Sequence, residues 1–505
     1  MSTDFSTLVD PTGQPVTGAP LGALITAQAA LAPNAPAVTA GGITWRFSDL
    51  DRASNRRARW LAALGVRQND VVFLALPNGL AYYECVFAVW KLGATPGHVS
   101  YRLTEPEFAA ILALGKPKLV IGESGHQGVT QPALLDNAFS DAPLPPAFAA
   151  SWKVSTSGGS TGRPKLVVDP NPAIWGPDKE GRRRLPRSII VNPAPLYHSG
   201  PFGTMLPAIA QGGHIIEAGS FDPEQFIKLL AMHKANWAYM VPTMMARIAH
   251  LPPEIIANYD ISELKSVVHM AAPCPAWVKR FWIDWLGPDV IWEVYGGTER
   301  IGATFIGGAE WMAHPGSVGR TAPGTQMAIF NEAGEILPAF SIGEIYFRIP
   351  GKPATFAYIG AEPRRHGDWT SFGDYGWLDD EGYLFIADRR TDMIISGGVN
   401  FYPAEIEAVI DAFPGVISSA VVGSPDADLG QALHAFVQVA LPGPEPGFEA
   451  SLREFVSTRL ARPKHPRSYD MVTEPVRDEA GKVRRSAWRE RRVAALGVTP
   501  ENLLQ

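Results

Sequence analysis

Hydroxyl groups, glycines and one lysine are concentrated in the segment from Ser155 to Lys165, which reads STSGGSTGRPK. Glycines allow backbone N–H groups to converge on one point, the hydroxyls add donors, and the lysine supplies a positive charge. Such a group of donors suits the anionic oxygens of a polyphosphate. We therefore predict a phosphate-binding loop, made of Thr156, Ser157, Gly158, Gly159, Ser160, Thr161, Gly162 and Lys165.

This loop differs from the P-loop of kinases and GTPases. In the P-loop the last glycine directly precedes the lysine and a helix follows, whereas here Arg163 and Pro164 separate the glycine from the lysine. Apolar residues 166–168 follow, so we predict a loop that connects two strands, with residues 152–154 ending the first. A polar hairpin turn without a ligand is the alternative for the loop alone.

Further motifs follow this loop along the chain. They are Tyr295-Gly296-Gly297-Thr298-Glu299 and the segments 373–378, 382–383, 388–392, 394–400, 402–407 and 481–485. With these motifs the chain resembles the adenylate-forming superfamily, which comprises acyl-CoA synthetases, firefly luciferases and the adenylation domains of peptide synthetases. The resemblance covers roughly residues 20–490.

The resemblance implies an ATP site. The ring of Tyr295 stacks on adenine, Thr298 contacts phosphate, and Glu299 holds magnesium, which prefers few carboxylates together with phosphate oxygens. Asp374 accepts from the ribose hydroxyls, and Arg389 contacts ribose or phosphate. The remaining predicted nucleotide residues are Ala272, Pro273 and the more ambiguous Glu293. Core packing of Tyr295 and a solvated charge at Arg389 are the alternatives.

The resemblance also implies two half-reactions. Lys482 stabilises charge where the carboxylate attacks the α-phosphate of ATP, and His198 closes the acyl site near that carboxylate. The small domain then rotates, and the loop with Gly397 and Gly398 helps to admit coenzyme A. Lys482 also lies in a basic run, so a solvated charge is its alternative, and a structural histidine is the alternative for His198.

Segments that line the family's acyl tunnel predict the substrate pocket. Its candidate residues are Phe202, Met240, Val241, Ala271, Gly296, Gly297 and Thr304, with Trp237 beside them. The two glycines leave the pocket floor open, so a bulky acid with a ring fits. The chain is most similar to AMP-forming ligases of bile-acid, steroid and aromatic acids. Acetate and long alkyl chains remain alternatives, and simple packing accounts equally well for Met240 and Val241.

Two residues depart from the family pattern. Thr391 stands at the presumed hinge, where the family usually has Asp or Lys, and Ala480 stands where Thr or Ser is commoner. Neither change removes a charge from the proposed chemistry. They bear on the movement of the small domain rather than on the reaction class.

The acceptor of the acyl group is open at this stage. The main prediction is an AMP-forming acid–CoA ligase that uses ATP, Mg²⁺ and coenzyme A. A stand-alone amide synthetase with an amine acceptor is the second hypothesis, and a non-catalytic nucleotide- or acyl-binding module is the third. The presence together of Lys165, Glu299, Asp374, Arg389 and Lys482 argues against the third.

The amino-acid composition limits the classes of partner that the protein can bind. The chain has 505 residues, 46% of them hydrophobic, and a net charge of −6, which provides no basic surface for a nucleic acid. Two cysteines, Cys85 and Cys274, indicate neither a disulfide framework nor a cysteine metal site. We expect no signal peptide and no membrane span, and we therefore predict a cytoplasmic protein without membrane or nucleic-acid partners. The oligomeric state is open, and a homodimer is one alternative.

Apolar segments alternate with helical patterns along the chain. Strands are predicted at 71–76, 188–191, 214–216 and 237–241, and helices at 81–92 and around 226–233. This alternation predicts an α/β fold with mainly parallel sheets. After Asp388 we predict a strand at 392–395, a helix at 403–413 and strands near 421 and 434–439. The predicted domains are a large adenylation domain, residues 1–388, and a small α+β lid domain, residues 389–505.

Overall fold

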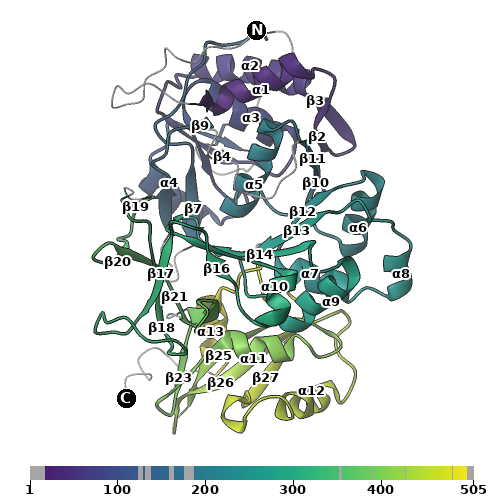
Figure 1. Cartoon of the computed structure of the whole chain (residues 1–505), viewed down its shortest axis with the longest axis vertical. Helices are drawn as coiled ribbons and strands as arrows, with labels where there is room; N and C mark the ends of the chain where they lie inside the picture. The colour runs from purple at the N-terminus through teal and green to yellow at the C-terminus, as the bar shows by residue number, and fades with distance from the viewer. Residues whose placement is uncertain are drawn as a thin grey trace.

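The computed structural model describes residues 18–122, 129–130, 138–158, 164–175, 187–351, 355–389, 392–426, 428–479 and 481–496. It is a mixed α/β structure with a large N-terminal domain and a small C-terminal domain, as predicted, and the small domain lies at the lower end in Figure 1. The predictions for Gly159, Ser160, Thr161, Gly162 and Thr391 fall outside the described residues. So do the side chains of Ser157 and Arg389.

A six-stranded sheet of described residues carries the predicted phosphate loop. Its strands, in spatial order, are β19 (Ala357–Ile359), β8 (Pro164–Val168), β7 (Val154–Gly158), β5 (Thr95–His98), β4 (Val71–Ala75) and β6 (Leu119–Gly122). The strands β7, β5, β4 and β6 are parallel, and β8 and β19 run antiparallel. Phe73 and Leu74 are fully buried on opposite faces, so this central strand is apolar throughout.

The structure corrects one prediction about this loop. Residues 152–154 are not the end of the first strand, because β7 begins at Val154 and continues to Gly158. Thr156 and Ser157 pair with Leu166 and Lys165 across an antiparallel ladder, and this pairing extends the strand into the loop motif. The prediction that the loop connects two strands is confirmed.

A nine-stranded sheet of described residues forms the second layer. In spatial order its strands are β16 (Arg320–Thr321), β15 (Ala303–Gly307), β14 (Ile291–Gly296), β13 (Ser266–Met270), β12 (Trp237–Met240), β10 (Ile189–Asn192), β11 (His214–Glu217), β2 (Pro36–Ala40) and β3 (Ile43–Arg46). The pairings from β14 to β2 are parallel. The carboxyl ends of β12, β13 and β14 therefore meet at one edge, where ligands of such sheets bind.

Helices connect and cover these sheets. They are α1 (Leu21–Leu31), α2 (Phe47–Ala63), α3 (Leu80–Lys91), α4 (Glu105–Gly115), α5 (Ser199–Ala210), α6 (Pro223–Met232), α7 (Pro242–Ala249), α8 (Pro253–Ala257), α9 (Ala276–Leu286) and α10 (Gly308–Ala313). The start of α6 is typical, because the Asp222 carboxylate accepts from the N–H of Gln225 at 2.8 Å and Pro223 occupies the first position. Its apolar residues Phe226 and Leu230 are buried, as the pattern predicts.

A third sheet of described residues is antiparallel. It contains β17 (Gln326–Phe330), β18 (Gly343–Arg348), β20 (Arg364–His366), β21 (Trp369–Leu378) and β22 (Leu384–Arg389). A short pair, β1 (Ala19–Pro20) and β9 (Ile174–Trp175), lies apart from it. Asp374 on β21 faces Arg389 on β22 in the backbone register.

The C-terminal domain contains β23 (Ile394–Ser396), β24 (Val399–Phe401), α11 (Pro403–Ile410), β25 (Val416–Asp426), β26 (Gly430–Val439), α12 (Phe448–Ser457), a 3₁₀ turn (Arg462–Lys464), β27 (Ser468–Val472) and α13 (Arg485–Ala495). The predicted helix 403–413 ends three residues early, at Ile410. The N–H of Phe413 donates to the carbonyl of Ile410, so the chain turns there before β25.

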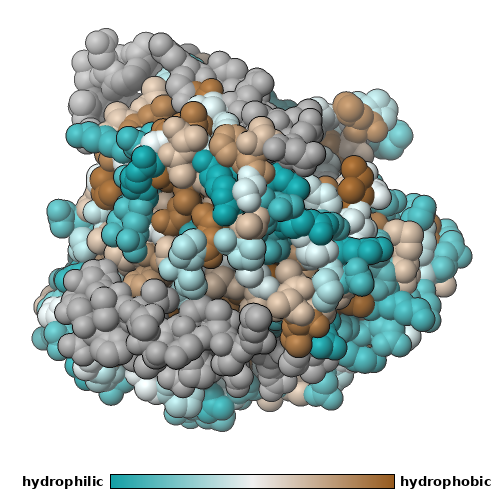
Figure 2. Space-filling view, turned by 90° about the horizontal axis from the view of Figure 1, so that it is seen from above, coloured by the Kyte–Doolittle hydropathy of each residue, from teal (hydrophilic) through white to brown (hydrophobic). Residues whose placement is uncertain are grey.

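In the view of Figure 2, hydrophobic residues occur in small groups separated by hydrophilic ones. None of the described helices has the length and apolar character that crossing a membrane requires. Cys85 and Cys274 are both free thiols.

Candidate active site

Lys165, Glu299 and Tyr358 form one contact group beside the predicted phosphate loop. The ammonium of Lys165, on β8, lies 3.3 Å from Glu299 Oε1 and donates to the Tyr358 hydroxyl at 2.8 Å. That hydroxyl in turn donates to Glu299 Oε1 at 2.5 Å. The structure thus brings together the lysine and the acid that were predicted to hold phosphate and magnesium, although they lie 134 positions apart.

Tyr358 is a residue of this group that sequence reasoning missed. It lies on β19, whose backbone pairs with β8, and Lys165 also lies over its ring at 3.9 Å. The surrounding segment has no motif, so only the pairing of two distant strands reveals it. The backbone carbonyl of Glu299 accepts from Thr355 at 2.8 Å, which holds the acid in place from the same side.

Metal binding at this site depends on Glu299. Among the described residues there is no group of three or more His, Cys, Asp or Glu side chains that could hold a metal alone. Magnesium binds one or two carboxylates together with phosphate oxygens. A single carboxylate beside a phosphate loop therefore fits Mg²⁺ bound together with a nucleotide.

Tyr295 and Asp374 lie together at the carboxyl end of β14. The Tyr295 hydroxyl donates to Asp374 Oδ2 at 2.7 Å, and the ring lies edge-on to Phe372 with centroids 6.0 Å apart. Tyr295 is half-buried and Asp374 buried. The predicted adenine and ribose residues are thus neighbours. Thr298 is half-buried between Gly297 and Glu299.

The two glycines before Thr298 are constrained by close neighbours. A Cβ on Gly297 would lie 2.4 Å from the ring of Phe372, so any side chain there displaces that ring. A Cβ on Gly296 would lie 3.2 Å from the Cβ of Ala303 on the paired strand. Ala271, which follows β13, has φ 81°, an unusual value for a residue other than glycine, and Ala272 and Pro273 follow it.

Glu293 is paired with a lysine inside the protein. The ammonium of Lys279, on α9, is fully buried and bonds to the Glu293 carboxylate. Burial raises the pKa of Glu293, and Lys279 partly offsets this. This contact supports a structural role for Glu293 at least as well as the predicted contact with a nucleotide.

The predicted pocket residues are largely buried. Phe202, Met240, Val241 and Thr304 are at most 1% exposed, and Thr304 donates to the carbonyl of Val318 at 2.6 Å. Phe202 packs among Trp90, His98 and Trp152. These side chains therefore act as packed walls, and the predicted roles in substrate binding stay predictions.

His198 lies directly before α5 and close to Lys482. Burial, and next the positive charge of Lys482, lower the pKa of His198 to about 4, with Asp478 acting in the opposite direction. The imidazole is therefore neutral at pH 7. His198 and Lys482, which are 284 positions apart in the sequence, therefore interact electrostatically.

A tight turn presents Lys482. Its N–H donates to Asp478 Oδ1, and the N–H of Asp478 donates to the carbonyl of Lys482, both at 2.9 Å. Gly481 has φ 75°, and a Cβ there would lie 3.3 Å from Thr243 Oγ1 and 3.6 Å from Val241 Cβ. The turn therefore approaches the large domain at the start of α7 so closely that glycine is favoured.

Contacts between the domains hold this turn in place. The Tyr197 hydroxyl donates to Glu479 Oε2 at 2.8 Å, and Arg102 lies 2.7 Å from Glu479 Oε1. A second ion pair joins Arg484 to Glu107 on α4 at 3.1 Å. Sequence reasoning missed these partners, although Glu479 lies beside the Gly-Lys motif.

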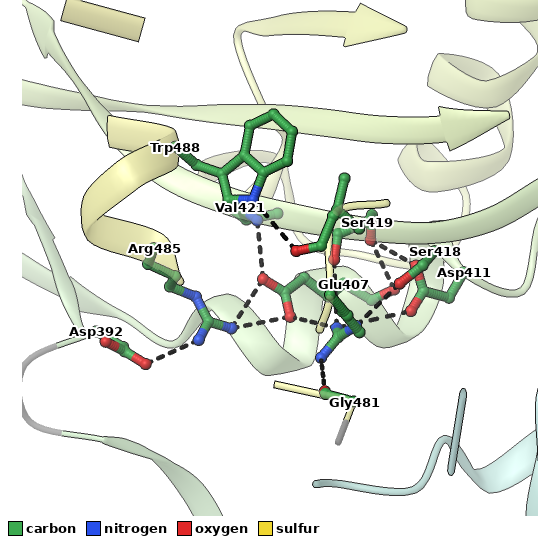
Figure 3. Close-up of polar contacts among 11 residues, drawn as sticks. Asp392, Glu407, Asp411, Ser418, Ser419, Val421, Gly481, Arg485 and Trp488 are labelled. Atoms are coloured by element: carbon green, nitrogen blue, oxygen red, sulfur yellow. Dashed lines mark hydrogen bonds and ion pairs between the residues drawn. The ribbon is translucent and has the colours of Figure 1, made fainter. Parts of the chain in front are cut away.

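A buried carboxylate organises the rear of the same turn (Figure 3). Glu407 on α11 accepts from Arg485 at 2.8 Å and from Arg477 at 2.9 Å. Arg485 also reaches Asp392 at 2.8 Å, and Arg477 donates to the carbonyl of Gly481 at 3.4 Å. Burial alone raises the pKa of Glu407, but the two arginines outweigh it and the pKa is lowered. This network connects the segment after the presumed hinge with the Lys482 turn.

Gly397 and Gly398 form the turn between β23 and β24, with φ 56° and 78°. The N–H of Gly397 donates to the carbonyl of Leu429 within the small domain. Thr156 donates from its hydroxyl to the carbonyl of His98, at the start of the phosphate loop.

Comparison with known proteins agrees with this arrangement. The profile of the AMP-binding enzyme family matches residues 25–352, and that of the AMP-binding enzyme C-terminal domain matches residues 405–482. A feruloyl-CoA synthase of Amycolatopsis sp is 31% identical over 496 residues, covering 93% of this chain and 99% of the relative.

Solved structures share the fold. The o-succinylbenzoate CoA synthetase of Bacillus subtilis, in complex with its acyl-adenylate intermediate, superposes with a TM-score of 0.77 at 23% identity, covering 94% of this chain and 99% of that one. An amide bond synthetase from Marinactinospora thermotolerans superposes with a TM-score of 0.74 at 22% identity, covering 93% and 99%.

Proposed function

Because the chain belongs to the AMP-binding enzyme family and is an AMP-forming acid–CoA ligase, we propose that it activates a bulky aromatic or polycyclic carboxylic acid. In the first half-reaction a carboxylate oxygen attacks the α-phosphorus of ATP. The acyl-adenylate forms and pyrophosphate leaves. In the second half-reaction the thiol of coenzyme A displaces AMP, which gives the acyl-CoA thioester.

The docking of the Lys482 turn beside the segment that carries His198 is the observation that carries this proposal: Tyr197, next to His198, bonds to Glu479, three positions before Lys482, at 2.8 Å. A positive charge at the junction of carboxylate and α-phosphate stabilises the charge that builds up in the transition state. His198 is neutral, so it orients the acid without repelling Lys482. The contacts of Glu479 with Tyr197 and Arg102 keep the Lys482 turn against the large domain during this step.

The other end of the nucleotide is assigned to the group around Lys165. Lys165 and the loop hydroxyls would orient the β- and γ-phosphates, and Glu299 would hold Mg²⁺, which would supply positive charge against the phosphates. With nucleotide and metal bound, Lys165 and Glu299 would contact the phosphates and the ion in place of each other. Tyr358 remains as the hydroxyl that orients the Glu299 carboxylate.

The nucleoside is assigned to Tyr295 and Asp374. The Tyr295 ring presents a face to adenine, while its hydroxyl fixes Asp374 for the ribose hydroxyls. Arg389, adjacent to Asp374 in the strand register, is proposed to contact ribose or phosphate. Ala272 and Pro273, after β13, are proposed to border the adenine.

The second half-reaction requires the small domain to rotate about the chain near Thr391. Lys482 then leaves the site, and the Gly397-Gly398 turn approaches to help admit coenzyme A. The domain boundary between residues 388 and 389 stays a prediction. The separate matches of the two family profiles, which end at residue 352 and resume at residue 405, support a division in this region.

The proposed substrate class has independent support. A curated relative is a feruloyl-CoA synthase, and its named substrate is an aromatic acid. The two glycines add nothing to this support, and the expectation that they leave the pocket floor open was wrong: the ring of Phe372 fills the space beside Gly297, and Ala303 fills the space beside Gly296. The proposal of a ring-bearing acid rather than acetate therefore rests on the named substrate of this relative.

Pyrophosphate release against a panel of carboxylic acids tests the proposal. Each acid is offered with ATP and Mg²⁺ alone, with coenzyme A, and with amines, and the products are identified by mass spectrometry. Acid-dependent pyrophosphate release with thioester formation is the expected result. Consumption of an amine instead of coenzyme A would identify an amide synthetase, and failure to bind ATP would contradict the enzymatic assignment.

A further inference from the structure

Four polar side chains are grouped beneath the start of α5. Lys153 donates to Ser199 Oγ at 2.5 Å, Ser155 Oγ lies 3.0 Å from the same atom, and His98 lies beside them on β5. Lys153 is 3% exposed, Ser155 1% and His98 0%. We refer to these four residues as the Lys153 cluster. Burial of a charged group at such depth is costly unless hydrogen bonds or ion pairs compensate it.

Strand geometry explains why these residues meet. Lys153 directly precedes β7, two positions before Ser155, and both contact the same Ser199 hydroxyl, while Ser155 is opposite His98 in the parallel register. On α5, Ser199 and Phe202 are three positions apart and share the helix face that packs on this sheet. The rings of Phe202 and His98 have centroids 3.6 Å apart.

The Lys153 cluster is continuous with the reacting centre. Ser199 directly follows His198, the residue whose pKa responds to Lys482. Ser199 is half-buried, and its hydroxyl contacts Lys153. Gly200 follows, and a Cβ there would lie 2.7 Å from the Tyr239 hydroxyl and 3.4 Å from Met270 Sδ, at the ends of β12 and β13.

His98 has an unused acceptor. The Tyr82 hydroxyl donates to the carbonyl of Leu196 at 3.1 Å, so His98 Nδ1, 3.0 Å away, is the donor to that hydroxyl. The proton is then on Nδ1, and Nε2 carries a lone pair. Nε2 is buried and has no hydrogen-bond partner among the described residues. Burial, and next the charge of Lys153, hold the pKa of His98 well below its usual value, so the ring stays neutral.

We infer that the Lys153 cluster is the part of the acyl site that receives a hydroxyl group of the acid. This inference rests on the proposed function. A hydroxyl donates to His98 Nε2 and accepts from Lys153 or Ser199, which satisfies both sides of the cluster. A second carboxylate or an ether oxygen has no proton for Nε2, so the preferred acids are hydroxylated aromatic or alicyclic acids.

The experiment compares acids that differ only in a hydroxyl. The pairs are benzoate with its 2-, 3- and 4-hydroxy derivatives, cinnamate with 4-hydroxycinnamate, and cyclohexanecarboxylate with its 3- and 4-hydroxy derivatives. We expect kcat/KM for pyrophosphate release to favour at least one hydroxylated member by about 10- to 100-fold. In His98→Leu and Lys153→Met this ratio is expected to fall to within about 3-fold of one.

His269→Leu is the matched control. His269 is likewise fully buried beside a lysine, Lys279, and neither of its ring nitrogens has a partner among the described residues. This substitution is expected to keep the hydroxyl preference whatever it does to stability. Ser199→Ala, at a half-buried position, tests the cluster even if the buried variants fail to fold. Thermal unfolding of each variant identifies such failures.

Two results would overturn the inference while leaving the proposed function in place. One is pyrophosphate release without preference for any hydroxylated member. The other is a preference that survives unchanged in Ser199→Ala and Lys153→Met. Absence of pyrophosphate release with every acid would instead contradict the proposed function, and the inference that rests on it would fail as well.

Discussion

The hydroxyl of Tyr197 donates to Glu479 across 2.8 Å, joining the large domain to a residue three positions before Lys482. Removing either partner is expected to weaken docking of the Lys482 turn. Tyr197→Phe and Glu479→Ala should each lower acid-dependent ATP–pyrophosphate exchange about 3- to 10-fold, the worth of one hydrogen bond. Thioester formation from a supplied acyl-adenylate should be unchanged.

Glu474→Ala is the control for this pair, since Glu474 is an exposed acid of the same domain that contacts Arg491. It should leave pyrophosphate exchange unchanged. A double variant of Tyr197 and Glu479 should lose no more than the stronger single variant. Fully additive losses would contradict a direct coupling.

Lys482→Ala should lower adenylate formation by at least about 10²- to 10³-fold, because one preorganised charge is lost from the transition state. The same variant should still convert a supplied acyl-adenylate to the thioester. Single-turnover measurement of each half-reaction separates the two. Lys464→Ala, which removes a half-buried lysine of the same domain that pairs with Glu405, should affect neither. Equal loss of both half-reactions would show that the division of labour is wrong.

Tyr358→Phe should raise the Mg²⁺ concentration needed for half-maximal activity by about 5- to 10-fold, because Glu299 loses the hydroxyl that orients its carboxylate. Titration of activity with Mg²⁺ at saturating ATP measures this. Tyr259→Phe is the matched control, since Tyr259 makes an equivalent bond to Glu224 at 2.8 Å on the surface. An equal rise of the half-maximal Mg²⁺ concentration in Tyr259→Phe would contradict the role of Tyr358 in orienting Glu299.

Glu407→Gln should destabilise the small domain by about 3 kcal/mol, because two arginines, with side chains 14% and 10% exposed, lose the buried carboxylate that they share. Urea unfolding followed by tryptophan fluorescence is the measurement, with Trp488 on α13 as a nearby reporter. The neighbouring Glu405 is an exposed acid on the same helix, so Glu405→Gln should change the free energy of unfolding by less than about 0.5 kcal/mol. Similar losses in both variants would contradict the role of the network.

The folded-state pKa of His198 is about 4, below its usual 6.5. Between these two pH values the unfolded chain binds a proton at this residue and the folded protein does not. Stability is therefore lost as the pH falls from 6.5 to 4, by at most about 1.4 kcal/mol per pH unit from this group. Urea midpoints at pH 7, 6 and 5 should fall less steeply in His198→Gln than in the unchanged protein. Parallel curves would contradict a depressed pKa.

The fold and much of the site could be predicted because local patterns carry them. The glycine and hydroxyl spacing around Lys165 predicts phosphate chemistry by itself, whereas the roles of Tyr295 to Glu299 follow from the resemblance to a known family. The alternation of strands and helices gives the parallel sheets. Strand ends were less certain, as the extension of β7 into the loop shows, because pairing with a neighbouring strand decides them.

Contacts between distant segments could not be predicted in this way. Tyr358 joins Lys165 only through the pairing of β19 with β8, and Tyr197 meets Glu479 from 282 positions away. The pairing of Lys279 with Glu293 was likewise hidden, because an isolated lysine in a helix is usually exposed. These partners depend on the packing of whole elements, and single-sequence periodicity contains no such information.

The ion pairs that join the two domains have a consequence for the catalytic cycle. The side chains of these ion pairs are between 39% and 64% exposed; they are Arg102, Glu479, Arg484 and Glu107. Dissolved ions therefore screen their attraction, with a screening length of about 8 Å at physiological ionic strength. A higher salt concentration shortens the time that the small domain stays docked on the large domain, and it leaves the reacting groups unchanged. Ionic strength thereby shifts which of the two chemical steps limits turnover.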